Sequence, residues 1–176
     1  HITVSLCVIW LKRYYFIICD NCLIMSVSLQ EQGKLNEAVE ACKKAILFNP
    51  NYAKAYFNMG IALQKQGKLE EAIESYKKAF SIKPDFADAH KNLSLALLNI
   101  GRFKEGLDQY EWRWKTEKYL SNKRNFIQPM WDGTQSLKNK RILIWCEQGI
   151  GDTLNWSSLL PLVSNHAAHC ILECQD

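Results

Sequence analysis

The chain has 176 residues, 48% of them hydrophobic and 23% charged, which excludes an intrinsically disordered protein and fits one ordinary domain or two small ones. Its net charge of +4 is unevenly placed. The segment from Arg113 to Arg141 holds eight Lys and Arg residues against Glu117 and Asp132, a surplus of +6, so the remainder sums to −2. A solvated basic linker is a commoner explanation for this positive surplus than a phosphate-binding surface. We therefore expect no nucleic-acid partner.

Residues 1–18 hold two short apolar runs, split by Lys12 and Arg13. Neither run reaches the roughly 18 residues of a spanning helix, and the basic residues follow the first run, whereas in a signal peptide they precede it. We expect no membrane span. The apolar residues show neither helical periodicity nor alternation, so the pattern predicts no element for this segment.

The seven cysteines are an odd number and too sparse for a secreted disulfide scaffold, which favours a reducing, cytoplasmic location. Cys19 and Cys22 have the CxxC spacing. No second CxxC or HxxxH pair completes a zinc site, so we expect no metal.

A period of 34 residues organises residues 19–118. A shift of 34 aligns QEQGKLNEA at 30–38 with QKQGKLEEA at 64–72, and also aligns Pro50 with Pro84. This is the period of the tetratricopeptide repeat, in which two antiparallel helices bury their apolar faces only by stacking on neighbouring repeats. The chain resembles that family, and the resemblance implies a mainly α solenoid of helical hairpins.

The middle repeat, counted from Ala53, matches the family pattern at eight of eight positions. The matching residues are Tyr56, Met59, Gly60, Leu63, Ala72, Tyr76, Ala79 and Pro84. Gly60 and Ala72 are expected where the two helices approach most closely, and Ala79 where the second helix meets the next repeat. The prolines end the second helices, and Gly67 permits the turn within the repeat.

The flanking repeats are degenerate, so the array has about three repeats. The first, from Cys19, has an atypical first helix that the pattern does not predict firmly. The third, from Ala87, departs from the pattern at four positions. They hold Ser94, Gly106, Arg113 and Lys118.

Asn58 and Asn92 occupy the same position one period apart on first helices, which line the concave face of such an array. A side-chain amide can donate to and accept from an extended peptide backbone. The pair resembles the asparagine ladder in the tetratricopeptide arm of O-GlcNAc transferases, which implies peptide holding, although the first repeat has Ile24 there. The alternative is a solvated polar face. Neighbouring candidates for peptide binding are Lys54, Phe57, Lys65, Lys91 and Asn99.

The helical period stops after residue 118. Residues 119–139 are predicted to be a basic linker. Residues 140–176 are predicted to hold a strand over 141–146, a glycine loop, a helix over 153–163 and a strand over 169–174. This order indicates a partial α/β unit, a Rossmann-like βαβ.

The glycine loop contains five candidate ligand-loop residues. They are Glu147, Gln148, Gly149, Gly151 and Asp152. Glycines between a strand and a helix let backbone N–H groups approach a ligand, and the helix N-terminus favours negative charge. The spacing is not a dinucleotide fingerprint and lacks the lysine of a P-loop. The alternative role for Asp152 is a helix N-cap.

The run from Glu111-Trp-Arg-Trp to the EQGIGDT stretch at 147–153 resembles a junction in bacterial tetratricopeptide proteins. There the array is fused to a GT-B-type glycosyltransferase domain related to the heptosyltransferases. The resemblance covers about residues 19–176 and implies an acceptor-binding first half, with Asp152 as general base, and a second half that binds a nucleotide sugar. The chain departs from it at Ser158, where an arginine is expected.

The favoured function is a peptide-binding module from a truncated glycosyltransferase. Because the chain ends just after the second predicted strand, we expect it to be catalytically inert and without a cofactor, the nucleotide sugar belonging to the full-length parent. The alternatives are a stand-alone scaffold, or a glycosyltransferase for a protein or saccharide acceptor once the missing half is supplied. Exposed strand edges in residues 130–176 also suggest dimerisation.

Overall fold

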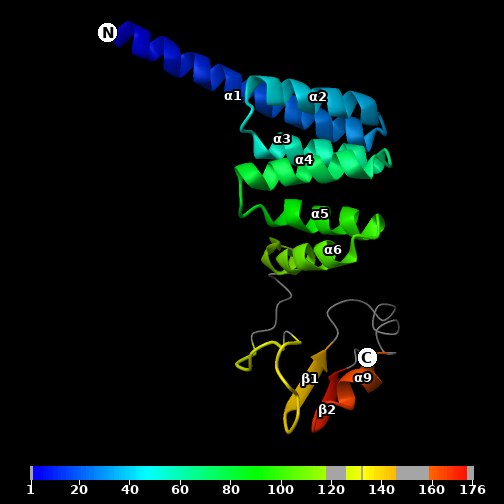
Figure 1. Cartoon of the computed structure of the whole chain (residues 1–176). Coiled ribbons are helices and arrows are strands. Elements are labelled where there is room, and N and C mark those ends of the chain that lie inside the picture. Colours follow the sequence, from blue (N-terminus) through cyan, green and yellow to red (C-terminus); the bar gives the residue numbers. More distant parts are fainter. Residues whose placement is uncertain (1, 118–125, 132, 146–158, 174–176) are drawn as a thin grey trace. The chain divides into compact units, whose positions relative to one another are not determined.

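The computed structural model describes residues 2–117, 126–131, 133–145 and 159–173, and the chain divides into two units, residues 1–121 and 122–176. The first unit is a stack of antiparallel helices, shown in Figure 1. Its elements are α1 (Ile2–Glu31), α2 (Leu35–Phe48), α3 (Ala53–Lys65), α4 (Leu69–Ile82), α5 (Ala87–Asn99), α6 (Phe103–Tyr110) and the 3-10 helix η1 (Glu111–Lys115). Each hairpin packs on the next, with α2 against α3 and α4 against α5.

Each hairpin turns at a glycine, as the sequence predicts. Gly33, Gly67 and Gly101 have φ angles of 75°, 78° and 81°, in the left-handed region that favours glycine. The amide after each glycine donates to the carbonyl five residues earlier, at 2.9–3.0 Å, which satisfies a carbonyl at the end of the first helix. Residues Asn49 and Lys83, which precede the prolines, are extended, so the second helices end there.

The core of the array lies between α2 and α5, where small residues allow close approach. Ala72 and Ala79 are fully buried, and a methyl group added to Gly60 would lie 2.5 Å from Cε1 of the buried Tyr76. Ile73, Leu93 and other apolar side chains join this cluster. The sequence prediction of where the helices approach most closely is confirmed at Gly60.

The last repeat is held together differently. Its second helix, α6, ends after eight residues and continues as η1. The His90 ring is sandwiched between Phe80 and Trp112, with ring centroids 4.3 and 3.9 Å apart, and Lys115 Nζ lies 3.8 Å from the centroid of Trp112. The His90 ring nitrogens also contact Gln109 Oε1 at 2.7 Å and the Pro84 carbonyl at 3.1 Å. Trp112 therefore packs on the array.

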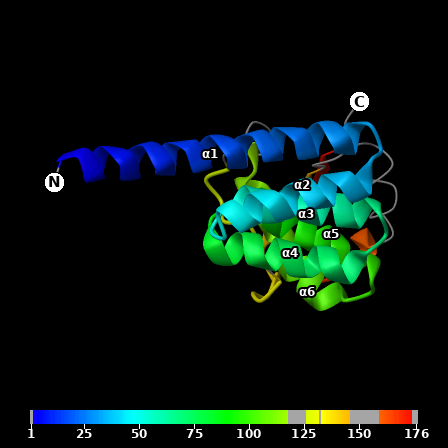
Figure 2. The same ribbon diagram turned by 90° about the horizontal axis from the view of Figure 1, so that it is seen from above.

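The first helix differs from the sequence expectation. The sequence pattern could not be interpreted for residues 1–18, yet α1 begins at Ile2 and its N-terminal half extends beyond α2, as Figure 2 shows. A helix with apolar residues all round has no periodic stripe for a sequence pattern to detect. The first helix of the first repeat, which the pattern did not predict firmly, forms with Cys19 and Ser26 buried. Within the described ranges, no helix is both long and apolar enough to span a membrane.

The second unit contains β1 (Arg141–Trp145), α9 (Leu160–Ser164) and β2 (His169–Glu173). The strands pair in parallel, with Leu143 opposite Ile171. Both predicted strands are thus present over their described residues, and α9 covers the last residues of the predicted helix and extends one residue beyond it. One parallel pair does not by itself define a Rossmann-like unit, so that assignment stays a prediction.

Candidate peptide-binding face

One stripe of each first helix is left uncovered by the array. Its positions are spaced by four, three and four residues, so they lie on one side of a helix, and no side chain at any of them is buried. We call the three stripes together the first-helix face. It comprises Asp20, Ile24, Val27 and Glu31 on α1; Lys54, Asn58, Ile61 and Lys65 on α3; and Asp88, Asn92, Leu95 and Asn99 on α5.

The three stripes are neighbours in space. First helices α1 and α3 contact each other, as do α3 and α5. The side chain of Gln30 on α1 donates to the Asn58 carbonyl on α3 at 3.2 Å, which ties these two helices together. Repeats related by a constant period present equivalent residues in the same direction, so the stripes form one surface.

An aliphatic row crosses this surface. Val27, Ile61 and Leu95 stand one period apart, and Val27 and Leu95 are 43% and 38% exposed. Ile61 rests against the core, and Ile24 beside Val27 is 67% exposed. Contiguous exposed aliphatic side chains mark a surface that a partner can cover. None of the three residues was among the predicted site residues, although the 34-residue shift that pairs Asn58 with Asn92 also pairs Ile61 with Val27 and Leu95.

The two predicted asparagines differ in their surroundings. The Asn92 side chain hydrogen-bonds to the hydroxyl of Tyr76, which also donates to Gln64 Oε1 at 2.8 Å. Burial raises the pKa of Tyr76, whereas the bond from Asn92 lowers it. The preceding repeat has Cys42 where this repeat has Tyr76. Asn58 therefore lacks the equivalent phenol, and its side-chain amide has no hydrogen-bond partner among the described residues.

The structure separates the remaining candidates into exposed and packed residues. Lys54 and Lys65 are exposed and make no ion pair with any described residue. Lys91 is half-buried and already has interactions of its own. Phe57 packs inward, with its ring centroid 4.8 Å from Phe86 and 6.0 Å from Tyr76. Asn99 is exposed as well, so Lys54, Lys65 and Asn99 are the candidates readily available to a partner.

One acidic residue of the face is engaged within the array. The Tyr52 hydroxyl donates to an Asp20 carboxylate oxygen, which links the start of α3 to α1. Burial raises the pKa of Tyr52, and the bond to Asp20 raises it further. The hydroxyl therefore stays protonated, and Asp20 has one oxygen occupied.

The predicted ligand loop cannot be placed. Glu147, Gln148, Gly149, Gly151 and Asp152 lie outside the described residues.

The two buried cysteines of the array, Cys19 and Cys42, are in environments that disfavour reactivity. Cys19 is buried, and its thiol donates to the Ala45 carbonyl at 3.6 Å. Burial raises the pKa of the Cys19 and Cys42 thiols, which disfavours the reactive thiolate. Among the side chains that the structure describes, no three His, Cys, Asp or Glu residues gather as metal ligands.

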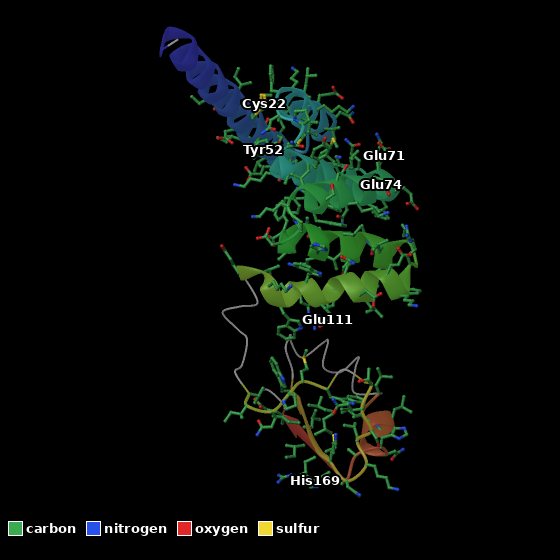
Figure 3. All side chains as sticks on the ribbon, turned by 60° about the vertical axis from the view of Figure 1, so that its left-hand side comes forward. Cys22, Tyr52, Glu71, Glu74, Glu111 and His169 are labelled. Atoms are coloured by element: carbon green, nitrogen blue, oxygen red, sulfur yellow. The ribbon has the colours of Figure 1, made fainter. Side chains whose placement is uncertain are left out.

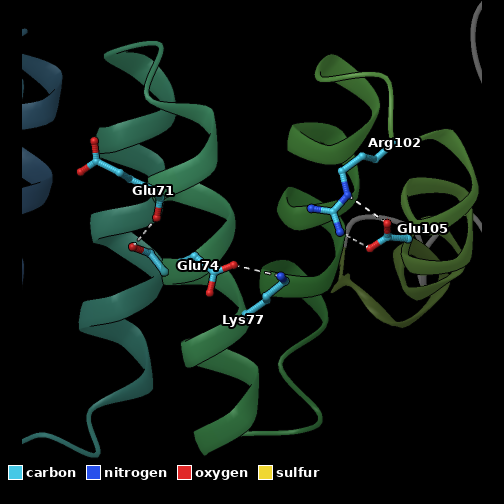
Figure 4. A network of polar contacts seen from close by, with 6 residues as sticks. Glu71, Glu74, Lys77, Arg102 and Glu105 are labelled. Atoms are coloured by element: carbon cyan, nitrogen blue, oxygen red, sulfur yellow. Dashed lines mark hydrogen bonds and ion pairs between the residues drawn. The ribbon is translucent and has the colours of Figure 1, made fainter.

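The second helices carry two shallow grooves, also one period apart. They have volumes of about 630 and 390 Å³, and Leu63 and Leu97 occupy the same position in each. Glu71 and Glu74 line the larger groove; Figure 3 shows them on α4, on the other side of the array from Tyr52. Most of the charges beside these grooves are paired within the array. The pairs are Glu40 with Lys43, Glu74 with Lys77 and Arg102 with Glu105, the last two drawn in Figure 4.

The stacked hairpins and their uncovered face define a helical-repeat protein, and comparison with known proteins specifies the repeat. The tetratricopeptide repeat family model matches residues 53–86, and a second TPR repeat model matches residues 29–67. The chain thus contains tetratricopeptide repeats, as its period predicts. No curated protein matches it.

Solved structures of MamA share the fold. One crystal structure of MamA has 27% sequence identity and a TM-score of 0.53, and the match covers 60% of this chain and 61% of that chain. A second has 26% identity and a TM-score of 0.52, covering 63% of this chain and 61% of the other. The chain therefore spans about three fifths of the length of the MamA chains that it matches.

Proposed function

We propose that this chain is a protein-interaction module that holds an extended peptide across its first-helix face. The observation that carries the proposal is the aliphatic row of Val27, Ile61 and Leu95, of which Val27 and Leu95 are exposed, beside the unoccupied amide of Asn58. Stacked helical repeats create extended concave surfaces that bind partners. The aliphatic row supplies apolar area, while an amide that donates and accepts can bond a peptide backbone whatever its sequence.

Asn58 and Asn92 make unequal contributions in this proposal. Asn58 is available, whereas Asn92 would have to leave the Tyr76 hydroxyl to reach a peptide. We expect Asn58→Ala to weaken peptide binding about two- to tenfold, because the equivalent of one hydrogen bond of about 0.5–1.5 kcal/mol is lost. Asn92→Ala should weaken it less. Fluorescence anisotropy with labelled peptides measures both, and unchanged affinity in the double variant would remove these amides from the function.

The second-helix grooves are the competing surface for a partner. Their charges are mostly paired already, so a partner would have to displace ion pairs that the array makes for itself. The matched control for the anisotropy experiment is Glu71→Ala, which alters the larger groove and leaves the first-helix face intact. We expect this variant to bind peptide like the parent chain.

A second candidate function concerns residues 140–176. We propose that they are the first βαβ of a GT-B-type glycosyltransferase domain, with Asp152 as the base; the parallel pairing of β1 with β2 supports this. That this chain alone is inert, binds no cofactor and resides in the cytoplasm stays a prediction. A nucleotide-sugar hydrolysis and transfer assay should detect no turnover. Turnover that disappears in Asp152→Asn would show an active enzyme, whereas a chain that only binds peptide acts as a scaffold.

A further inference from the structure

We infer that the peptide held on the first-helix face carries an aliphatic side chain at every third residue, with acidic side chains beside the middle one. The inference rests on the proposed function of this face and names its ligand class. It is carried by two observations: the aliphatic row repeats once per first helix, and the charges at its edges change from one helix to the next.

The spacing follows from the distance between the helices. α1, α3 and α5 contact one another in turn, and the axes of packed helices lie about 8–10 Å apart. A polyproline II peptide advances about 3.1 Å per residue, so three residues span about 9 Å. In a β-strand, same-side residues recur about every 6.6 or 13 Å, and neither distance matches the helices. A peptide that crosses them therefore meets Val27, Ile61 and Leu95 with every third side chain.

The other two residues of each turn point toward the two edges of the face, because a polyproline II helix has three residues per turn. On α3 these edges are Lys54 and Lys65, about 16 Å apart along the helix axis, on either side of Asn58 and Ile61. Neither lysine makes an ion pair with a described residue, and the sequence of α3 contains no Asp or Glu. Acidic peptide residues on both sides of the middle aliphatic residue complement this pair.

The outer first helices, α1 and α5, carry no lysine at the positions that correspond to Lys54 and Lys65 of α3. α1 has Asp20 and Glu31 there, and α5 has Asp88 and Asn99. Acidic residues beside the first or third aliphatic residue would face like charges, which disfavours binding by both repulsion and desolvation. The aliphatic row alone would let a repetitive peptide slide by one repeat. The charges at the edges set its register.

The first experiment compares three labelled peptides of equal composition by anisotropy titration. The test peptide has leucines at its first, fourth and seventh residues and glutamates at its third and fifth. One control moves the leucines to the second, fourth and sixth residues and keeps the glutamates. The other keeps the leucines and moves the glutamates to the second and sixth residues, beside the first and third leucines. We expect each control to bind about tenfold more weakly than the test peptide.

Protein variants then locate the contacts. Val27→Ser and Leu95→Ser should each weaken the test peptide several-fold. Leu47→Ser is the matched control, because Leu47 is 77% exposed on α2, away from the face. Lys54→Glu combined with Lys65→Glu should reverse the charge preference, so that lysines in place of the glutamates restore binding. A misfolded protein would show no such restoration.

These experiments distinguish a failure of this inference from a failure of the proposed peptide-binding function. Equal affinity for the leucine spacings would overturn the every-third-residue pattern while leaving peptide binding in place. Binding that ignores the lysine reversal would overturn the charge register. Failure of all these peptides, and of a diverse peptide library, to bind at all would remove the proposed function itself.

Discussion

The middle repeat and the last repeat share a 34-residue period but are stabilised by different contacts. In the middle repeat, α3 and α4 meet at Gly60, where the Tyr76 ring fills the space that a methyl group would need. In the last repeat, Gly106 takes the place of the alanine on the second helix, and Leu98 fills the gap. Close approach of the helices at small residues stabilises the interior of the array, whereas stacking of larger side chains stabilises its last repeat.

The difference follows from what each repeat has to support. An internal repeat needs small residues on both helices, because neighbours approach it from both sides. At the position of Ala79, the last repeat has Arg113, whose guanidinium lies 4.4 Å from the Tyr110 ring centroid and 4.6 Å from that of Trp114. The small residue on which a following first helix would pack is therefore absent at this position. The last repeat ends the regular array.

The largest expected effect tests this contrast at one repeat position. Tyr76→Ala should lower the free energy of unfolding by about 3–5 kcal/mol, because the ring is fully buried and its loss leaves a cavity beside Gly60. Tyr110→Ala, one period later, should cost less than half of that, since Tyr110 is only half-buried. Urea unfolding followed by far-UV circular dichroism measures both. Equal losses would mean that the two repeats are packed alike.

Glycine substitutions test the same contrast with a smaller effect. Gly60→Ala should destabilise the array by about 1–3 kcal/mol, because the new methyl group overlaps the buried Tyr76 ring. Gly106→Ala should cost less than Gly60→Ala. Its methyl group would lie 2.8 Å from Cγ and Cδ2 of the half-buried Leu98 and 3.3 Å from the Leu98 backbone nitrogen, and this aliphatic side chain can shift more readily than the buried Tyr76 ring. A larger loss for Gly106→Ala than for Gly60→Ala would contradict this account.

Much of the array could be predicted from sequence because its determinants are local. The turn at Gly67 needs only a left-handed residue between two helices, and the end of α4 needs only Pro84. The 34-residue period then predicts that the hairpins stack on one another. The N-terminal part of α1 escaped prediction because the apolar residues of 1–18 follow no helical period. The stack of His90 with Trp112 escaped because it joins residues 22 apart, whose contact depends on how α6 ends.

The candidate site was predictable in position more than in detail. Asn58 and Asn92 are equivalent in sequence, yet Asn92 bonds Tyr76 while Asn58 follows a repeat that has Cys42 instead. Whether an amide is available depends on a residue in the preceding hairpin, which a single-position pattern does not register. Phe57 illustrates the reverse case, since its ring packs inward against Phe86.

The aromatic stack of the last repeat should show a measurable coupling. His90→Ala and Trp112→Ala should each destabilise the array, and the double variant should lose about 1 kcal/mol less than the sum of the two, because each single change already breaks the stacked pair. Phe103, exposed on α6, provides the control pair with His90, for which we expect additive effects. Additivity for His90 with Trp112 would show that their stacking contributes nothing.

The smallest expected effect concerns the exposed ion pair of Arg102 and Glu105 at the start of α6, the second helix of the last repeat. Arg102 donates to both carboxylate oxygens, at 2.9 and 2.5 Å, and this hydrogen bonding lowers the pKa of Glu105 below its ordinary value of 4.5. A carboxyl group whose pKa is lower in the folded state stabilises the fold above its unfolded pKa, and that stability is lost as the pH falls through the folded value.

Because the pair is exposed, solvent screens it, and removing it should leave the melting temperature at pH 7 nearly unchanged. Arg102→Ala should instead raise the pKa of Glu105 toward 4.5 in a carboxyl carbon NMR titration, and Arg102→Lys should raise it less, since a lysine keeps the charge without the paired donors. An unchanged Glu105 titration in Arg102→Ala would show that this end of the repeat has no ion pair in solution.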